Sequence, residues 1–206
     1  SVQALRAKRL KMLIAHSTVA QLGYLMFVFP VTVASLQASE DGQLLWVLEA
    51  AKGSVYQVLA HALAKASIFL VAGYLLLALR HDRITDLRGL AERMPFAVFT
   101  LGLAAFSLIG LPPTGGFVAK WLLLHAVIGM QQWWLVPFIL GGGLLTAGYL
   151  FRVLHVALLS GELTPEPVAV PRGLQFCAFV PAVLSLVIGI LANDLLYLMP
   201  IGDPFA

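Results

Sequence analysis

The chain has 206 residues, of which 60% are hydrophobic and 11% charged, with a net charge of +3 and a mean hydropathy of +0.92. This composition is typical of an integral membrane protein, because no soluble core needs so much apolar surface. The basic residues form no polybasic block, which argues against a nucleic-acid partner. The single cysteine, Cys177, excludes a disulfide framework and a cysteine metal site, and its apolar neighbours predict a small core residue.

A helix needs about 20 apolar residues to cross a hydrocarbon core of roughly 30 Å. The first candidate span, residues 12–36, follows the basic segment 6–11 and contains Pro30, which we expect to kink the helix or end it early. In the acidic segment 39–52 that follows, the sequence LLWVLEAA predicts a short interfacial helix. The second candidate span, residues 54–79, carries His61 and Lys65 in its interior.

A loop with four arginines, residues 80–93, follows the second span. The remaining candidate spans are residues 96–109, 111–130, 133–159 and 173–197. The sequence thus predicts an all-α polytopic bundle of about six spans, with residues 1–206 forming one transmembrane domain. Two spans separate the basic segments 6–11 and 80–93, so both should lie on one side of the membrane, which the excess of lysine and arginine predicts to be cytoplasmic.

The segment FSLIGLPPTGGFVAK, residues 106–120, joins an apolar run to a lone Lys120. The residues expected to break the helix are Gly110, Pro112, Pro113, Gly115 and Gly116. Lipid offers no water to free backbone groups, so a broken helix at membrane depth must pack in protein or line a wet cavity. If the next span begins after Gly116, Lys120 snorkels to the interface. If it begins at Pro112, Lys120 is buried, and the length of the span favours this alternative.

Titratable residues inside spans are functional candidates, because charge at membrane depth is costly. His61 and Lys65 are four residues apart and share a helix face, so together they could pass a proton. Lys120 and His125 repeat the pairing, although five residues rotate them by about 140°. Structural alternatives are a hydrogen bond from His61 to a backbone carbonyl and snorkelling by the lysines. With no carboxylate expected inside a span, water or an acidic neighbour on another chain would have to solvate these cations.

Several motifs occur in the order found in a known family. The segments KRLKMLIAHSTVAQLGY, LAHALAKASIFLVAG and DLRGLAERMPFAVFTLGLAAFSLIGLPPTGGFVAKWLLL resemble the antiporter-like subunits of respiratory complex I, membrane-bound hydrogenases and Mrp-type sodium/proton antiporters. The motif HALxKAxxF supplies His61 and Lys65, and GLPPxxGFxxK supplies Lys120. The resemblance implies that Lys120 is the lysine of a discontinuous helix at the centre of a proton half-channel. Gln57 stands where some members have a histidine, and His16 where a tyrosine is usual.

The resemblance implies two inverted repeats, of which this chain holds the second repeat and the helices after it. The chain would then be a fragment, one half of a split subunit or a minimal subunit, with other membrane subunits, and a chain supplying the first repeat, as partners. The implied function is proton translocation through Lys120, Lys65 and His61, and by extension His125, in a bacterial or archaeal energy-coupling membrane, without cofactor or metal. Alternatives are sodium/proton exchange of the Mrp type and a structural half-subunit that conducts nothing.

Overall fold

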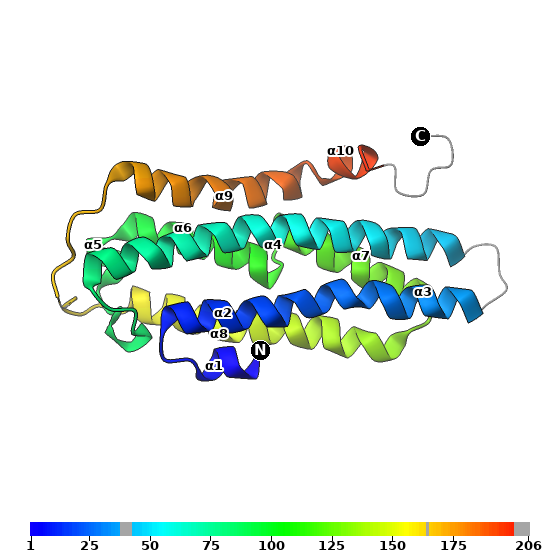
Figure 1. Cartoon of the computed structure of the whole chain (residues 1–206), viewed down its shortest axis with the longest axis horizontal. Coiled ribbons are helices and arrows are strands. Elements are labelled where there is room, and N and C mark those ends of the chain that lie inside the picture. The colour runs from blue at the N-terminus through cyan, green and yellow to red at the C-terminus, as the bar shows by residue number, and fades with distance from the viewer. Residues whose placement is uncertain (38–42, 164, 200–206) are drawn as a thin grey trace.

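The computed structural model describes residues 1–37, 43–163 and 165–199, which form an elongated bundle of helices (Figure 1). The α-helices are α1 (Val2–Arg6), α2 (Leu10–Leu22), α3 (Val28–Gln37), α4 (Gln43–Leu79), α5 (Leu90–Arg93), α6 (Pro95–Ile109), α7 (Gly115–Gly129), α8 (Val136–Leu158), α9 (Arg172–Ile190) and α10 (Ala192–Tyr197). The 3-10 helices are η1 (Gly23–Phe27), η2 (Ile84–Asp86) and η3 (Trp133–Leu135). No strand occurs in these described residues, so the predicted all-α class is confirmed.

Four segments of the described chain are long and apolar enough to cross a membrane: Leu10–Leu36, Leu44–Leu79, Trp133–Leu158 and Arg172–Ile190. In contrast, α6 and α7 have 15 residues each. At 1.5 Å per residue, each extends about 22 Å, which is shorter than the hydrocarbon core. Neither helix can therefore cross the membrane by itself.

The helices α6 and α7 follow one another in the same direction along the bundle (Figure 1). The hydrophobic core agrees, because α6 packs with the second half of α4 in one cluster, whereas Ala50 near the start of α4 packs with α7 in another. The segments 96–109 and 111–130 are therefore the two halves of one interrupted helix and not two separate spans.

The first span is interrupted near Pro30, as the sequence predicts. The helix tightens into η1 directly before it and continues as α3, which contains the proline. Proline lacks an N–H to donate to the carbonyl of Met26, four residues earlier, and its ring crowds that carbonyl. The proline thus distorts the span without ending it.

The second span is longer than predicted. Residues 43–79 form one helix of 37 residues, so LLWVLEAA is the beginning of α4 and not a separate interfacial helix. Gly53 does not break it and instead allows close packing on α7, because a Cβ there would lie 3.1 Å from the Leu122 Cβ and 3.2 Å from the Leu123 Cγ. Glu49 consequently lies within α4, in the part that precedes the predicted span 54–79.

The two ends of the bundle differ in chemistry. The basic segments 6–11 and 80–93 meet at one end, where the Leu10 N–H donates to the Asp82 carbonyl at 2.7 Å and Arg9 lies 3.7 Å from the Asp82 carboxylate. Their predicted placement on one side is thus confirmed. Exposed tryptophans Trp133 and Trp134 lie at the start of α8, at the opposite end, as residues of a membrane interface commonly do.

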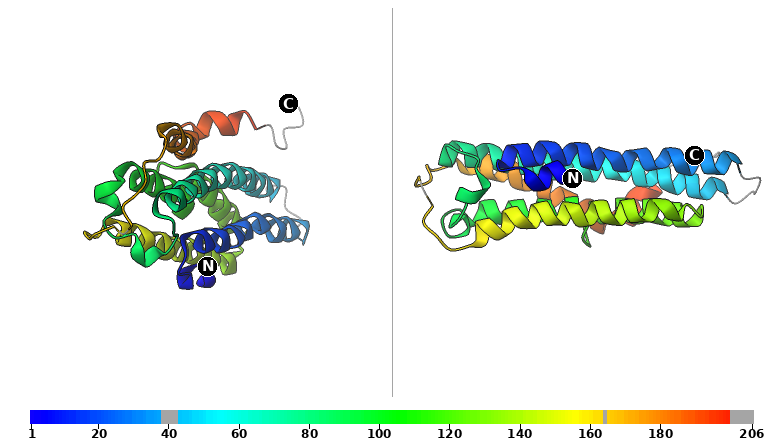
Figure 2. Two further views of the ribbon diagram at one scale, coloured as in Figure 1. Left: turned by 60° about the vertical axis from the view of Figure 1, so that its left-hand side comes forward. Right: turned by 90° about the horizontal axis from the view of Figure 1, so that it is seen from below.

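The outermost long helix, α9, corrects the prediction for Cys177. This helix lies on the outer side of the bundle (Figure 2), and its buried residues are Ala178, Ala182 and Ser185. Cys177 directly precedes this buried stripe and is exposed, so it is not a core residue. An apolar run alone could not reveal which of its residues turn outward.

Candidate functional site

The interruption between α6 and α7 lies near the middle of the bundle (Figure 1). Gly110 ends α6 in the left-handed conformation, with φ +87°, and the N–H groups of Gly110 and Leu111 both donate to the Phe106 carbonyl at 3.0 Å. Helix α7 begins at Gly115 after Thr114, whose hydroxyl donates to the Leu111 carbonyl at 2.7 Å. The predicted start at Pro112 is therefore wrong, because Pro112 belongs to the connection between the halves.

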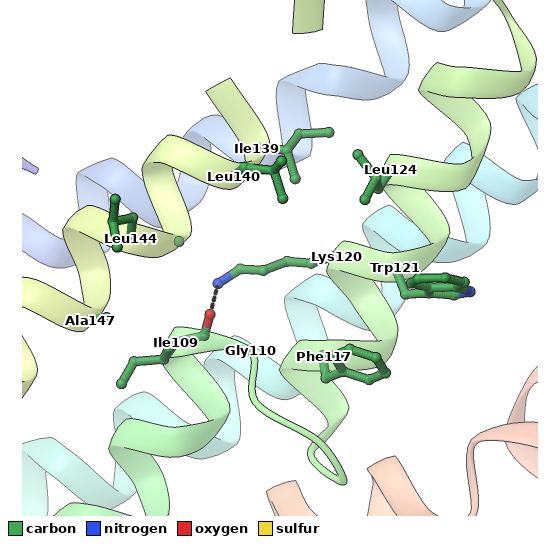
Figure 3. A pocket seen from close by; sticks show the side chains of 11 residues that line it. Ile109, Gly110, Phe117, Lys120, Trp121, Leu124, Ile139, Leu140, Leu144 and Ala147 are labelled. Atoms are coloured by element: carbon green, nitrogen blue, oxygen red, sulfur yellow. Dashed lines mark hydrogen bonds between the residues drawn. The ribbon is translucent and has the colours of Figure 1, made fainter. Parts of the chain in front are cut away.

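Lys120 on α7 reaches back to the end of α6 (Figure 3). Its Nζ donates to the Leu108 carbonyl at 2.9 Å and to the Ile109 carbonyl at 2.5 Å. Carbonyls in the last turn of a helix lack partners within the helix and carry the negative end of its dipole. The ring of Tyr24 adds a cation–π contact, with Nζ 5.2 Å from its centroid. The ammonium is thus held by backbone dipoles and an aromatic face, and no carboxylate of the described residues pairs with it.

The glycines of the break make room for this arrangement. A Cβ on Gly110 would lie 2.8 Å from the Lys120 Cδ and 3.1 Å from its Nζ. A Cβ on Gly116 would collide with the Ser107 carbonyl, so the two half-helices can approach each other only at a glycine. Gly115 is similarly enclosed, since its Cβ would lie 2.7 Å from the Ile188 Cδ1 of α9. The predicted helix-breaking glycines are therefore packing positions, while Pro112 and Pro113 are exposed.

A pocket of about 370 Å³ opens beside the Lys120 ammonium, between the end of α6, α7 and α8 (Figure 3). Its lining includes Phe117, Trp121, Leu140 and Leu144, so apart from the ammonium it is largely apolar. The charged end of Lys120 thus lies at the boundary between the packed break and an open space.

Lys65 lies in the unbroken part of α4 and is buried, with 5% of its surface exposed. Its Nζ donates to the Ile14 carbonyl of α2 at 2.7 Å and to the hydroxyl of Ser17. Ser17 in turn donates to the same Ile14 carbonyl at 2.8 Å. The partners of this second ammonium are therefore also uncharged, and they come from a neighbouring helix.

His61 lies one turn before Lys65 on α4. Both nitrogens of its ring are buried and have no hydrogen-bond partner among the described residues, so the predicted alternative of a bond to a backbone carbonyl is not observed there. The residue before His61, Ala60, packs against the start of α7, where a Cβ on Gly115 would lie 3.2 Å from the Ala60 Cβ. The structure thus brings the sequence-predicted residues His61, Lys65 and Lys120 into one region.

His125 lies apart from this group. Its side chain is 51% exposed, and its Nδ1 lies 2.7 Å from the Glu49 Oε2 of α4. The Trp46 ring packs edge-on against the imidazole, with centroids 5.2 Å apart. Sequence reasoning missed Glu49 as a partner, although the absence of a helix breaker in LLWVLEAA could have placed it in the span.

Sequence reasoning also missed a set of buried amide and hydroxyl groups between the two lysines. The Gln21 Nε2 donates to the Leu108 carbonyl at 3.2 Å and to the Thr146 Oγ1 at 3.0 Å. The Gln57 Nε2 donates to the Gln21 Oε1 at 3.1 Å. The sequence did contain part of this information. Ser17 and Gln21 are four residues apart on α2 and therefore share one helix face.

Comparison with known proteins shows the family of the chain. Residues 1–146 match the family model described as NADH:quinone oxidoreductase/Mrp antiporter, TM. The chain belongs to this family. It is 36% identical over 167 residues to NADH-quinone oxidoreductase subunit N of Desulforudis audaxviator, which covers 81% of this chain and 30% of that protein.

Solved structures show the same fold. A chain of the Mrp complex from Dietzia sp. superimposes with a TM-score of 0.80 at 21% identity, covering 98% of this chain and 45% of that one. A chain of respiratory complex I from Thermus thermophilus gives a TM-score of 0.76 at 21% identity, covering 93% and 38%. The present chain therefore spans less than half the length of each of these relatives.

Proposed function

We propose that the chain is the second-repeat part of an antiporter-like subunit that moves protons within a multi-subunit membrane complex of the NADH:quinone oxidoreductase type. The observation that carries the proposal is that Lys120 places its ammonium on the free carbonyls of a broken helix, in the same region as Lys65 and His61. Ionisable groups kept at membrane depth at such a cost commonly mark an ion path. Related membrane subunits, including one that supplies a first repeat, are the proposed partners.

In this proposal, Lys120 is the central proton carrier and Lys65 is the connecting site. Each amine can hold a proton, because uncharged oxygens stabilise its ammonium form: two carbonyls for Lys120, and a carbonyl and a hydroxyl for Lys65. These oxygens do not neutralise the charge, so a proton on one lysine still repels a proton on the other.

The imidazole of His61 suits a relay between the two lysines, since neither ring nitrogen is occupied by a described protein group. Its ring can therefore accept a proton at one nitrogen and release one from the other. We assign His125 a separate role near the surface, where together with Glu49 it would exchange protons with the aqueous phase.

Exchange of sodium for protons is the second candidate, favoured by the Mrp part of the family description and by the likeness to the Mrp complex. It predicts that the flux of protons depends on sodium and needs no redox substrate. A structural half-subunit that conducts nothing is the third candidate, and it predicts that both buried lysines can be replaced without loss of flux.

The test measures proton flux with a pH-sensitive dye, in vesicles that hold the intact native assembly. Lys120→Ala and Lys65→Ala are compared with Lys52→Ala, a matched lysine nearer the start of the same helix as Lys65. We expect flux to be lost in the first two variants and retained in the third, at equal subunit content. Normal flux in both Lys120→Ala and Lys65→Ala would refute the proposal, and a strict requirement for sodium would favour exchange.

A further inference from the structure

We infer that Gln21 is a positioning residue, whose amide holds the end of α6 beneath Lys120 and ties it to the helix face that binds Lys65. The inference rests on the proposed function. It adds a residue that, within the described part of the chain, forms no hydrogen bond to either lysine but bonds a carbonyl that holds one of them. Gln21 is buried, with 1% of its surface exposed.

Gln21 and Lys120 share one hydrogen-bond acceptor. The Leu108 carbonyl accepts hydrogen bonds from the Lys120 Nζ at 2.9 Å and from the Gln21 Nε2 at 3.2 Å. A carbonyl oxygen has two lone pairs, so both bonds can form together. When Lys120 releases its proton or turns away, Gln21 still holds this carbonyl. The Leu108 carbonyl is thereby kept in position to accept from the ammonium when Lys120 is protonated again.

The NH₂ and the oxygen of the Gln21 amide both have partners, and the amide can lie only one way. Because the Leu108 carbonyl can only accept, the group facing it must be the NH₂ of Gln21. Its other N–H donates to the Thr146 Oγ1 at 3.0 Å, and its oxygen accepts from the Gln57 Nε2 at 3.1 Å. Thr146 in turn donates to the Gly142 carbonyl of α8 at 2.8 Å. Gln21 thus joins α4, α6 and α8 from its position on α2.

One face of α2 carries groups that take part in both lysine sites. Ser17, one turn before Gln21, accepts a hydrogen bond from the Lys65 Nζ. The Tyr149 hydroxyl donates to Thr146 at 3.3 Å, which adds a further buried group beside Gln21. An oxygen that holds Lys65 therefore lies on α2, and Gln21 on the same helix face bonds an oxygen that holds Lys120. A shift of α2 would therefore displace the oxygens that bind Lys65 and, through Gln21, a carbonyl that binds Lys120.

The experiment replaces Gln21 in the native assembly and follows proton flux as a function of pH. In Gln21→Ala, we expect a fall of about tenfold, the size that corresponds to losing one well-placed buried hydrogen bond. In Gln21→Glu, an ionised carboxylate close to the Lys120 ammonium favours its protonated form, so the alkaline limb of the pH profile should move to higher pH. The matched controls are Gln175→Ala and Gln175→Glu, because Gln175 also donates to a carbonyl, that of Val170, but stands outside the set.

A second pair of variants allows the inference to be tested even if the Gln21 variants assemble poorly. Thr146→Val removes the acceptor of Gln21, and Thr100→Val is its control, since both threonines are buried and donate to the carbonyl four residues earlier at 2.8 Å. We expect reduced flux only in Thr146→Val. A purely structural role would lower the amount of assembled protein, but it would not move the pH profile of flux normalised to that amount.

The outcomes separate this inference from the function on which it rests. If Gln21→Glu keeps the wild-type pH profile and Thr146→Val pumps like Thr100→Val, while Lys120→Ala abolishes flux, the inference is wrong and the proposed function stands. If Lys120→Ala and Lys65→Ala both pump normally, the proposed function itself fails. A shifted profile in Gln21→Glu together with reduced flux in Thr146→Val supports the inference.

Discussion

Lys65 and Lys120 have the same chemistry but are held in different ways. Lys65 lies in an unbroken helix, whose interior carbonyls are occupied by the helix itself, and its ammonium donates to Ile14 and Ser17 of a neighbouring helix. Lys120 lies just after a break, and its ammonium donates to carbonyls that the break has left free. A continuous helix must thus obtain its oxygens from a neighbour, whereas a broken helix provides them from its own backbone.

The comparison indicates where each site is vulnerable. The Lys120 site depends on backbone conformation, and therefore on the glycines that permit it. The Lys65 site depends on a side chain, that of Ser17. Changes to the glycines should disturb the first site more than any single side-chain truncation disturbs the second, because a displaced backbone affects both acceptors together.

The largest effect is expected for Gly110→Ala. Gly110 has φ +87°, a conformation that costs an L-residue about 1–2 kcal/mol, and its new Cβ would also collide with the Lys120 side chain. We expect a lower unfolding temperature and loss of proton flux. The control is Gly73→Ala in α4, where a Cβ meets nothing within 4 Å and alanine favours the helix by up to about 1 kcal/mol. Thermal unfolding and flux are measured for both variants.

A Gly110→Ala variant that unfolds at the wild-type temperature and pumps normally would contradict this explanation of the Lys120 site. A variant that is destabilised but retains flux per assembled complex would show that the break supports the fold without positioning the lysine.

An intermediate effect is expected for Ser17→Ala. The change removes one of the two oxygens that hold the Lys65 ammonium, a charge-assisted bond of about 1.5–3 kcal/mol, but the Ile14 carbonyl remains. Flux should fall by about tenfold or more and not vanish. Ser185→Ala is the matched control, because Ser185 is equally buried and donates to a carbonyl three residues earlier, as Ser17 does, without contacting a lysine. Equal flux in the two alanine variants would mean that Ser17 contributes nothing to the Lys65 site.

The sequence was sufficient for the parts of the site that are local. The spacing of His61 and Lys65, and the glycines and prolines before Lys120, depend only on neighbours along the chain. The same glycines and prolines are compatible with a loop that reverses the chain and with a break that does not, which is why residues 96–109 and 111–130 could be taken for separate spans. Only the packing of both halves along α4 distinguishes these cases.

Non-local contacts were beyond the reach of sequence patterns. Gln21 and Thr146 are 125 positions apart, and neither lies in a motif that marks the other as its partner. The apolar runs likewise did not show that Cys177 would turn outward or that α4 would begin early enough to contain Glu49. These features depend on which helix lies beside which, and hydrophobic periodicity does not encode that choice when nearly every residue is apolar.

The smallest effect is expected for Glu49→Gln, at the surface pair that belongs to neither lysine. The Glu49 Oε2 lies 2.7 Å from the His125 Nδ1, but both side chains are partly exposed, so the pair contributes less than about 1 kcal/mol and should weaken as salt is raised. Flux should change by less than about twofold, because water can reach the exposed histidine in place of the carboxylate. Glu166→Gln is the control, since Glu166 lies 3.7 Å from Arg93 and is largely exposed.

The matching change on the other partner, His125→Gln, tests whether His125 is a third proton-carrying group beside Lys65 and Lys120. Proton flux is measured in the same way. A modest reduction in flux would place His125 at a surface that water can bypass, which is the role proposed for it. A loss as large as that of Lys120→Ala would make His125 an obligatory carrier. The carboxylate of Glu49 would then stabilise a proton-carrying group, His125. This differs from both lysines, whose ammonium groups are bound by uncharged oxygens.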